Sequence, residues 1–185
     1  MNTTENMQRT GDWFLTFSGR KFYPLDALPD DIIIEDIAHA LSNICRFGGH
    51  TNCFYSVAQH SVIVSNNVPS EWQLLALLHD ATEAYVGDMV RPLKYNMPAY
   101  MEAEQKLWAV ISDKFGLPFR IPPIVKAADN RALMTERRDL LIQSNYRWTG
   151  QDEFPPFRTK IYAMSPHFAE QDFLQRYDEL TARSE

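Results

Sequence analysis

The most constraining feature of this sequence is a strongly apolar segment that leads directly into two ionisable residues. Residues 74–78 contain four leucines at helical spacing, and His79-Asp80 follows at once. A helix this apolar belongs at the buried centre of a fold. Because it is costly to remove ionisable side chains from water unless they are paired or bind a metal, His79 and Asp80 indicate a polar site inside the core.

Apolar residues recur at helical spacing along most of the chain. Two Ser-x-x-Gln patterns, at Ser56 and Ser70, are typical of capping boxes at helix starts. Prolines at positions 98, 123 and 166 suit first helical turns, and glycines at 48, 49, 87 and 116 suit helix ends. We therefore expect helices over about residues 35–47, from 56 onward, and over 70–85, 98–115, 123–140 and 165–180.

One strand signal interrupts this helical pattern. Two aromatic-rich stretches, residues 13–17 and 21–23, flank Ser18-Gly19-Arg20, which suits a short hairpin with Gly19 at a positive φ. Residues 145–162 have no period and predict an irregular connection. The expected fold is all-α with a small N-terminal β-hairpin, and we draw no domain boundary within residues 1–185: the hairpin covers about 13–23 and the helical core about 35–183.

Composition narrows the classes of function. The 185 residues are 45% apolar and 23% charged, which is ordinary globular usage and argues against a disordered or coiled-coil chain. The net charge of −6 disfavours stable binding to nucleic acid or to an anionic membrane surface, so any phosphate site must be local. The start of the chain is polar and has no secretory core, so we expect a cytoplasmic protein with Cys45 and Cys53 as reduced thiols.

Two further polar residues are candidates for the site that His79 and Asp80 indicate. His60 and Asp129 each interrupt an otherwise apolar face of a predicted helix. Taken singly, His60 also fits a core histidine whose ring nitrogens are hydrogen-bonded, and Asp129 also fits a capping carboxylate. Together with His79-Asp80 they form a set of two imidazoles and two carboxylates. This set suits one divalent transition metal, manganese, cobalt, zinc or iron, better than calcium or magnesium.

Two acidic residues follow the His-Asp pair. Glu83 lies four residues after His79, and on one continuous helix it shares that face, near enough to act on a metal-bound water. Asp88 follows Gly87 just past the expected helix end, where it can orient water or substrate. The alternatives are a solvated helix carboxylate for Glu83 and an ordinary turn residue for Asp88.

Four segments resemble the HD phosphohydrolase superfamily. Their sequences are Ile-Cys-Arg-Phe-Gly-Gly-His (44–50), Tyr-Ser-Val-Ala-Gln-His-Ser (55–61), Leu-Leu-His-Asp-Ala-Thr-Glu-Ala-Tyr (77–85) and Gly-Asp-Met-Val-Arg-Pro-Leu-Lys (87–94). The order His60, His79-Asp80, Asp129 is similar to the order of that superfamily's metal ligands. The likeness is closest to bacterial 5'-deoxynucleotidases and to phage or prophage proteins that include dATP triphosphohydrolases, and it extends over about residues 22–138.

The resemblance implies a role for each residue of the site. His60, His79, Asp80 and Asp129 would ligate one divalent metal. Glu83 would do general acid/base work, and Asp88 would hold the attacking water. Phosphate would be clamped by Arg46 and Lys94, with Phe47 stacked on the sugar or base and Pro92 as a wall of the pocket. The chain departs from the deoxynucleotidase pattern at Gln59, where Glu is common, and at Phe47, where Trp is common.

The expected activity is therefore hydrolysis of a small deoxynucleotide, most simply as a 5'-deoxynucleotidase that releases phosphate from dNMPs. The alternatives are a dATP or dNTP triphosphohydrolase, a phosphodiesterase of dinucleotides, a non-catalytic nucleotide sensor and a purely structural helical domain. We also expect a homo-oligomer, whose candidate contacts are exposed aromatic residues in the hairpin and at Trp148, Phe154 and Phe157.

Overall fold

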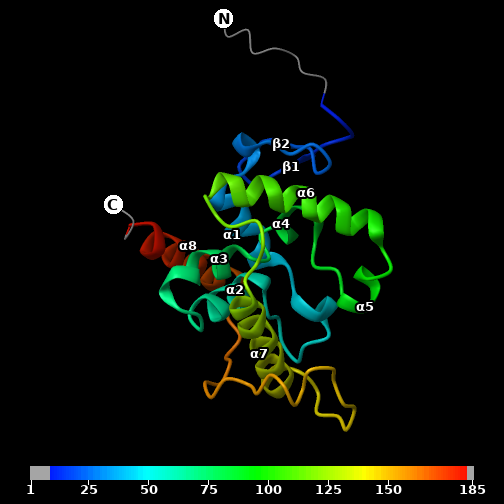
Figure 1. The fold of residues 1–185 in the computed structure, drawn as a ribbon, viewed down its shortest axis with the longest axis vertical. Coiled ribbons are helices and arrows are strands. Elements are labelled where there is room, and N and C mark those ends of the chain that lie inside the picture. The colour runs from blue at the N-terminus through cyan, green and yellow to red at the C-terminus, as the bar shows by residue number, and fades with distance from the viewer. Residues whose placement is uncertain (1–8, 183–185) are drawn as a thin grey trace, which may run out of the picture.

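The computed structural model describes residues 9–182, which are mostly helical with one small antiparallel hairpin (Figure 1). This confirms the expected all-α fold class with an N-terminal hairpin. The strands are β1 (Phe14–Leu15) and β2 (Lys21–Phe22). The helices are α1 (Ile34–Asn43), α2 (Val57–Ser65), α3 (Gln73–Leu78), α4 (Glu83–Val86), α5 (Arg91–Lys94), α6 (Pro98–Lys114), α7 (Pro123–Leu140) and α8 (Pro166–Thr181).

Several helix starts follow the sequence signals. Helices α6, α7 and α8 each begin with proline, which lacks the amide hydrogen that a first turn leaves unpaired. Ser56 caps α2 because its Oγ accepts the backbone N–H of Gln59 at 3.1 Å. In the hairpin, Phe14 pairs with Phe22, and Gly19 turns the chain at φ 80° as expected.

The prediction of one helix over residues 70–85 was wrong. Helix α3 ends at Leu78, residues 79–82 form a turn, and α4 then covers Glu83–Val86. The N–H of Ala81 donates to Leu78 and that of Glu83 donates to Asp80, so hydrogen bonds three residues apart replace those of an α-helix. Ser70 does not cap this segment but starts a short 3₁₀ turn, Ser70–Trp72.

The first helix also ends earlier than predicted. Helix α1 stops at Asn43, and the chain is extended at Ile44 and Cys45 before the 3₁₀ turn Arg46–Gly49. The N–H of Val57 donates to Ile44 O at 3.1 Å, and that of Arg46 donates to Tyr55 O at 2.9 Å. These backbone bonds to the start of α2 take the place of further helical turns. They also set Arg46 beside α2.

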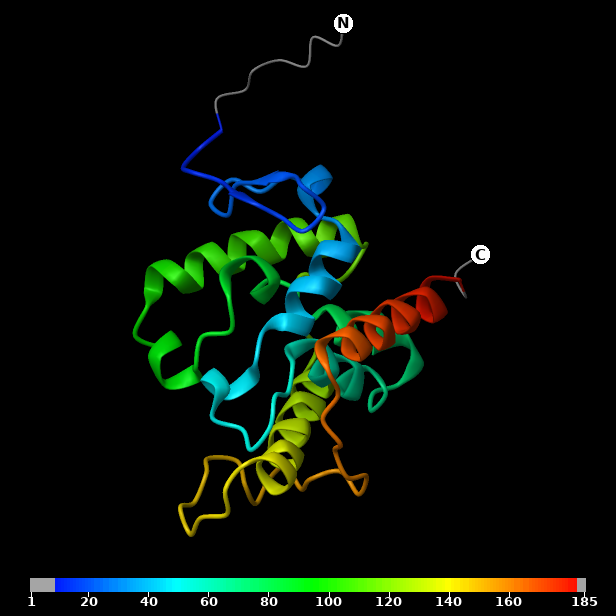
Figure 2. The ribbon, with the colours of Figure 1, turned by 180° about the vertical axis from the view of Figure 1, so that it is seen from behind.

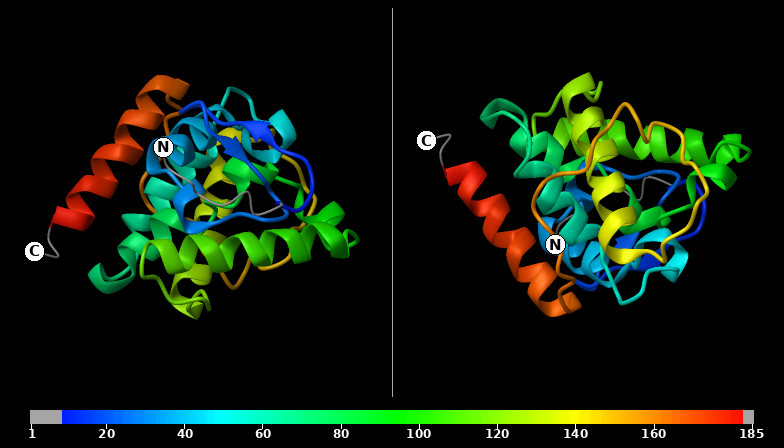
Figure 3. Two further views of the ribbon diagram at one scale, coloured as in Figure 1. Left: turned by 90° about the horizontal axis from the view of Figure 1, so that it is seen from above. Right: turned by 90° about the horizontal axis from the view of Figure 1, so that it is seen from below.

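The main core lies where α1, α2, α3 and α8 pack together, and α8 lies across α1, α2 and α3 (Figure 2). The long helix α6 lies on a different side of this group from α8 (Figure 3), and the hairpin lies above α6 in the view of Figure 1. A second cluster joins α2 and α3 to α7 and includes Phe157, which is only 5% exposed. The expectation of an exposed Phe157 was therefore wrong, because this ring fills a core.

The irregular connection between α7 and α8 is tied to α2 by one side chain. Gln59 donates from Nε2 to Tyr162 O at 2.7 Å and accepts the N–H of Met164 at 3.0 Å. The second half of the predicted capping box is therefore absent, because this side chain reaches across to residues 162–164. No helix among residues 9–182 is long and apolar enough to cross a membrane.

Candidate metal centre

Three elements bring the predicted metal ligands together. Helix α2 packs against both α3 and α7, so His60, the turn His79-Asp80 and Asp129 meet in one place. Nε2 of His60 lies 3.2 Å from Asp129 Oδ1 and 3.6 Å from Asp80 Oδ2. Nε2 of His79 lies 3.3 Å from the same Asp80 oxygen. Residues that are up to 69 positions apart in the sequence thus form one cluster.

The donor atoms of this cluster fit a metal ion. One ligand atom each from His60, His79 and Asp129 lies within 4.8 Å of the others. Both Nε2 atoms are buried, and within residues 9–182 neither has a hydrogen-bond partner despite the nearby carboxylates. Buried polar atoms without partners are uncommon unless something else binds them. The group can therefore hold a divalent metal, and Asp80 is close enough to both imidazoles to join it.

Each imidazole is oriented by a contact of its Nδ1 atom, on the opposite side of the ring from Nε2. The Nδ1–H of His79 donates to Ala76 O at 2.8 Å, one turn back in α3. Nδ1 of His60 lies 2.5 Å from Oε1 of Glu136, a residue of α7 that has no exposed surface. We did not predict Glu136 from the sequence. The available signal is that it follows Asp129 by seven residues, which is two turns along the same helix face.

The charged groups of the cluster shift one another's pKa values. Burial and the Arg46 guanidinium lower the pKa of His60, but the negative charges of Glu136 and Asp129 outweigh them and raise it to about 9 in the metal-free chain. Burial raises the pKa of Asp129, but the adjacent imidazoles hold it well below its usual range. The site thus combines a carboxylate, Asp129, that stays ionised easily with a histidine, His60, that attracts a proton or a cation.

Glu83 has a different environment from the ligands. It is 7% exposed at the start of α4, and its Oε2 has no hydrogen-bond partner in the described part of the chain. Burial, then the charges of Asp80 and Asp88, raise the pKa of Glu83 well above the ordinary value. Asp88 follows Gly87, and burial also raises its pKa. The predicted common helix face of His79 and Glu83 does not exist, because the turn after α3 is not α-helical.

The two predicted phosphate-binding cations have different carboxylate partners. The Arg46 guanidinium is nearly buried, with Nη1 3.5 Å from Asp80 and Nη2 3.3 Å from Glu136. Lys94, at the end of α5, pairs with Glu104 of α6 at 2.6 Å. Phe47, next to Arg46, has a φ of 57°, which an aromatic residue rarely adopts.

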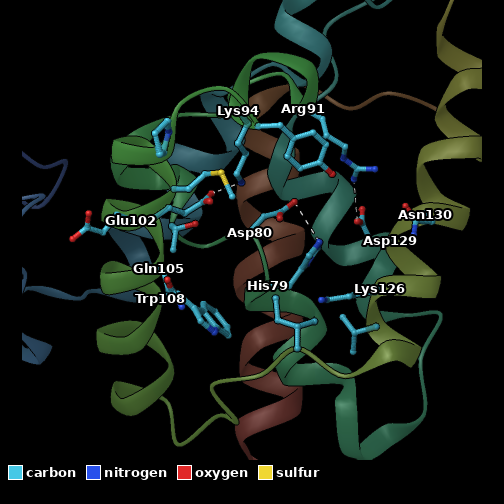
Figure 4. Close-up of a pocket in the computed structure, with 17 residues that line it drawn as sticks. His79, Asp80, Arg91, Lys94, Glu102, Gln105, Trp108, Lys126, Asp129 and Asn130 are labelled. Atoms are coloured by element: carbon cyan, nitrogen blue, oxygen red, sulfur yellow. Dashed lines mark hydrogen bonds and ion pairs between the residues drawn. The ribbon is translucent and has the colours of Figure 1, made fainter. Parts of the chain in front are cut away.

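A cavity of about 910 Å³ lies between α5, α6 and α7, beside the candidate metal ligands (Figure 4). His79, Asp80 and Asp129 line it together with Lys94, and Figure 4 shows them facing Gln105 and Trp108 of α6. Sequence reasoning missed Arg91 and Lys126, two further basic residues of the lining. The lining residues in the part of the chain that is described do not include Arg46, Phe47, Glu83, Asp88 or Pro92, so the contacts of these residues with a ligand stay predictions.

Comparisons with known proteins find related bacterial chains. No protein-family model matches the chain. The uncharacterized protein YfdR of Escherichia coli is 46% identical over 167 residues, which are 90% of this chain and 94% of YfdR. The uncharacterized protein RCAP_rcc00048 of Rhodobacter capsulatus is 39% identical over 69% of this chain and 72% of its own length. The 5'-deoxynucleotidase PBPRA2627 of Photobacterium profundum is 34% identical over 43% of this chain and 38% of its own.

Proposed function

This chain belongs to the bacterial protein family that includes YfdR of E. coli, and from its metal cluster we propose that it is a metal-dependent hydrolase of deoxynucleotide phosphates. The observation that carries the proposal is the meeting of His60, His79 and Asp129 beside a cavity that His79 and Asp129 line, with Nε2 of both imidazoles buried and without a hydrogen-bond partner among the described residues. The partial relative named a 5'-deoxynucleotidase supports the choice of substrate. The reaction that we propose first is the conversion of a dNMP into a deoxynucleoside and phosphate.

The chemistry that a divalent metal supplies in such a site is the activation of water and the neutralisation of phosphoryl charge. His60, His79, Asp80 and Asp129 would hold it. Manganese, cobalt, zinc and iron all accept this mixture of imidazole and carboxylate ligands.

The remaining residues of the site would move protons and bind phosphate. Glu83 suits proton transfer because burial and the charges of Asp80 and Asp88 raise its pKa above the ordinary value of a carboxyl group. Asp88 would orient the attacking water. Arg46 can offer a planar pair of donors to phosphate oxygens, and Lys94 can add a point charge when it exchanges Glu104 for the substrate.

A second candidate activity is triphosphate release from a dNTP. It is favoured by the cavity lining, which adds Arg91 and Lys126 to the basic residue Lys94. Three cations at different places in the lining can contact more than one phosphate group of a polyphosphate, once substrate replaces Glu104 as the partner of Lys94. Attack at the α-phosphorus would then give a deoxynucleoside and triphosphate.

Product analysis tests both activities. The purified chain, loaded in turn with manganese, cobalt, zinc or iron(II), is incubated with the four dNMPs, the four dNTPs and the matching ribonucleotides, and the products are separated by chromatography. We expect phosphate from dNMPs, or triphosphate from dNTPs, and loss of either activity in Glu83→Ala.

The matched control is Glu71→Ala, which removes an exposed carboxylate from the turn before α3. It should hydrolyse as the wild type does. If the metal-loaded wild type releases neither phosphate nor polyphosphate from any nucleotide, the proposed hydrolase is wrong, and a nucleotide sensor becomes the better description.

A further inference from the structure

A fully buried acidic residue stands behind the metal cluster. Glu136 lies on α7, and none of its surface is exposed. Its Oε1 lies 2.5 Å from Nδ1 of His60 and accepts the hydroxyl of Tyr55 at 3.0 Å. Its Oε2 lies 3.3 Å from Nη2 of Arg46. One carboxylate thus touches a candidate metal ligand and a candidate phosphate-binding cation.

The contact with His60 decides which nitrogen of the ring is free. A carboxylate oxygen only accepts, so Nδ1 keeps its hydrogen and Nε2 is the nitrogen that can give up a proton and offer its lone pair to a metal. Nε2 lies 3.6 Å from Asp80 and 3.2 Å from Asp129. The Tyr55 hydroxyl occupies a second lone pair of the same oxygen, which holds the carboxylate in this orientation.

The second oxygen of Glu136 contacts Arg46. Arg46 reaches both Glu136 and Asp80, and its Nε has no hydrogen-bond partner among the described residues. Oε2 of Glu136 also has no hydrogen-bond partner among the described residues, so Glu136 acts on Arg46 through the attraction of a buried charge at 3.3 Å. A buried ion pair is weak evidence for stability, because apolar replacements are often as stable. The contacts of Glu136 therefore point to a role in the site.

We propose that Glu136 is a positioning residue that sets His60 for metal binding and Arg46 for phosphate binding. This inference rests on the proposed metal-dependent function. It predicts that changes at Glu136 separate into two effects, one on metal affinity through His60 and one on the KM through Arg46.

Metal affinity is measured by zinc competition against a chromophoric chelator, and the ligand field by the absorption spectrum of the cobalt-loaded protein. Glu136→Leu removes the acceptor for the imidazole, so we expect metal binding to weaken roughly 10- to 100-fold with a changed cobalt spectrum. Glu136→Gln keeps an oxygen acceptor for Nδ1–H, so its metal affinity should return to within about threefold of the wild type.

Glu136→Gln should instead raise the KM for a deoxynucleotide roughly tenfold at saturating metal, with a smaller change in kcat, because a neutral amide holds Arg46 less firmly. The control on the same helix is Asp139→Asn, since Asp139 bonds Arg138 and Ile161 and not the site. Its metal affinity and KM should equal those of the wild type.

The outcomes separate the two proposals. If the wild type binds none of the four metals, the proposed function fails. If the wild type binds metal and folded Glu136→Leu binds it equally well, the positioning role of Glu136 is overturned. Should Glu136→Leu not fold, Glu136→Gln decides, and an unchanged KM in that variant overturns the role.

Discussion

Lys94 illustrates how a single side chain in this structure can serve both fold and site. Its Nζ pairs with Glu104 at 2.6 Å, and it lines the cavity beside Asp80. We expect Lys94→Met to raise the KM for the deoxynucleotide about 10- to 100-fold, because a charge-assisted bond to phosphate contributes about 1.5–3 kcal/mol. Metal affinity should not change, because Lys94 touches no ligand of the cluster. Steady-state kinetics and metal titration measure the two quantities.

The control for this change is Lys106→Met on α6. Lys106 pairs with Glu102 one turn away, is largely exposed and does not line the cavity among the described residues. Its removal should leave the KM unchanged. Equal effects of the two variants would mean that the cavity does not bind phosphate through Lys94.

At the scale of elements, Asp139 joins the end of α7 to the irregular connection before α8. Its Oδ2 accepts the N–H of Ile161 at 2.8 Å, and Arg138 pairs with both of its oxygens. The hydrogen bonds from Arg138 hold the pKa of Asp139 below its usual range. The folded state therefore has the lower pKa, so this stabilisation is present above the unfolded value of about 3.9 and is lost as the pH falls through the folded value.

Asp139→Asn should accordingly lower the free energy of unfolding by about 1 kcal/mol at pH 7 and by progressively less below pH 4. Urea denaturation at pH 7 and at pH 3 measures both values. A difference between variant and wild type that grows toward low pH would contradict the assigned ionisation of Asp139.

Sequence reasoning could predict helix ends that are set by residues next to them. It failed for helix ends that are set by contacts with distant parts of the chain. Pro123 and Ser56 act on their own first turns, so the starts of α7 and α2 were correct. The break after Leu78 and the early end of α1 depend on packing and on backbone bonds to the segment before α2.

The same distinction holds within the site. His60 and Asp129 were identifiable because each places a polar group on an apolar face, and the structure brings both together with His79. Glu136 was not predicted because its role depends on its contacts with His60 and Arg46, and no local sequence pattern indicates these contacts.

For the whole molecule, the exposed hairpin is relevant to assembly. Leu15 and Phe17 are 64% and 63% exposed, and Trp13 and Phe14 lie beside them. Because contiguous apolar patches on a surface are typical of interfaces, we expect a homo-oligomer that contacts through the hairpin. Leu15→Glu should shift the mass measured by light scattering toward the 21.4 kDa of one chain. Ile142→Glu, at an exposed position outside the hairpin, is the control, and equal masses for all three proteins would contradict this contact.

Metal binding should also stabilise the molecule as a whole. The ligands come from α2, the turn after α3 and α7, so the unfolded chain has no assembled site, and a bound ion links elements across the core. At a free metal concentration of 100 times Kd, linkage predicts about 2.7 kcal/mol of added stability. For a chain of this length that raises Tm by about 5–11 °C. We expect a chelator to reverse the rise and His79→Ala to abolish most of it. Identical melting curves with and without metal would instead favour a purely structural role for these buried histidines.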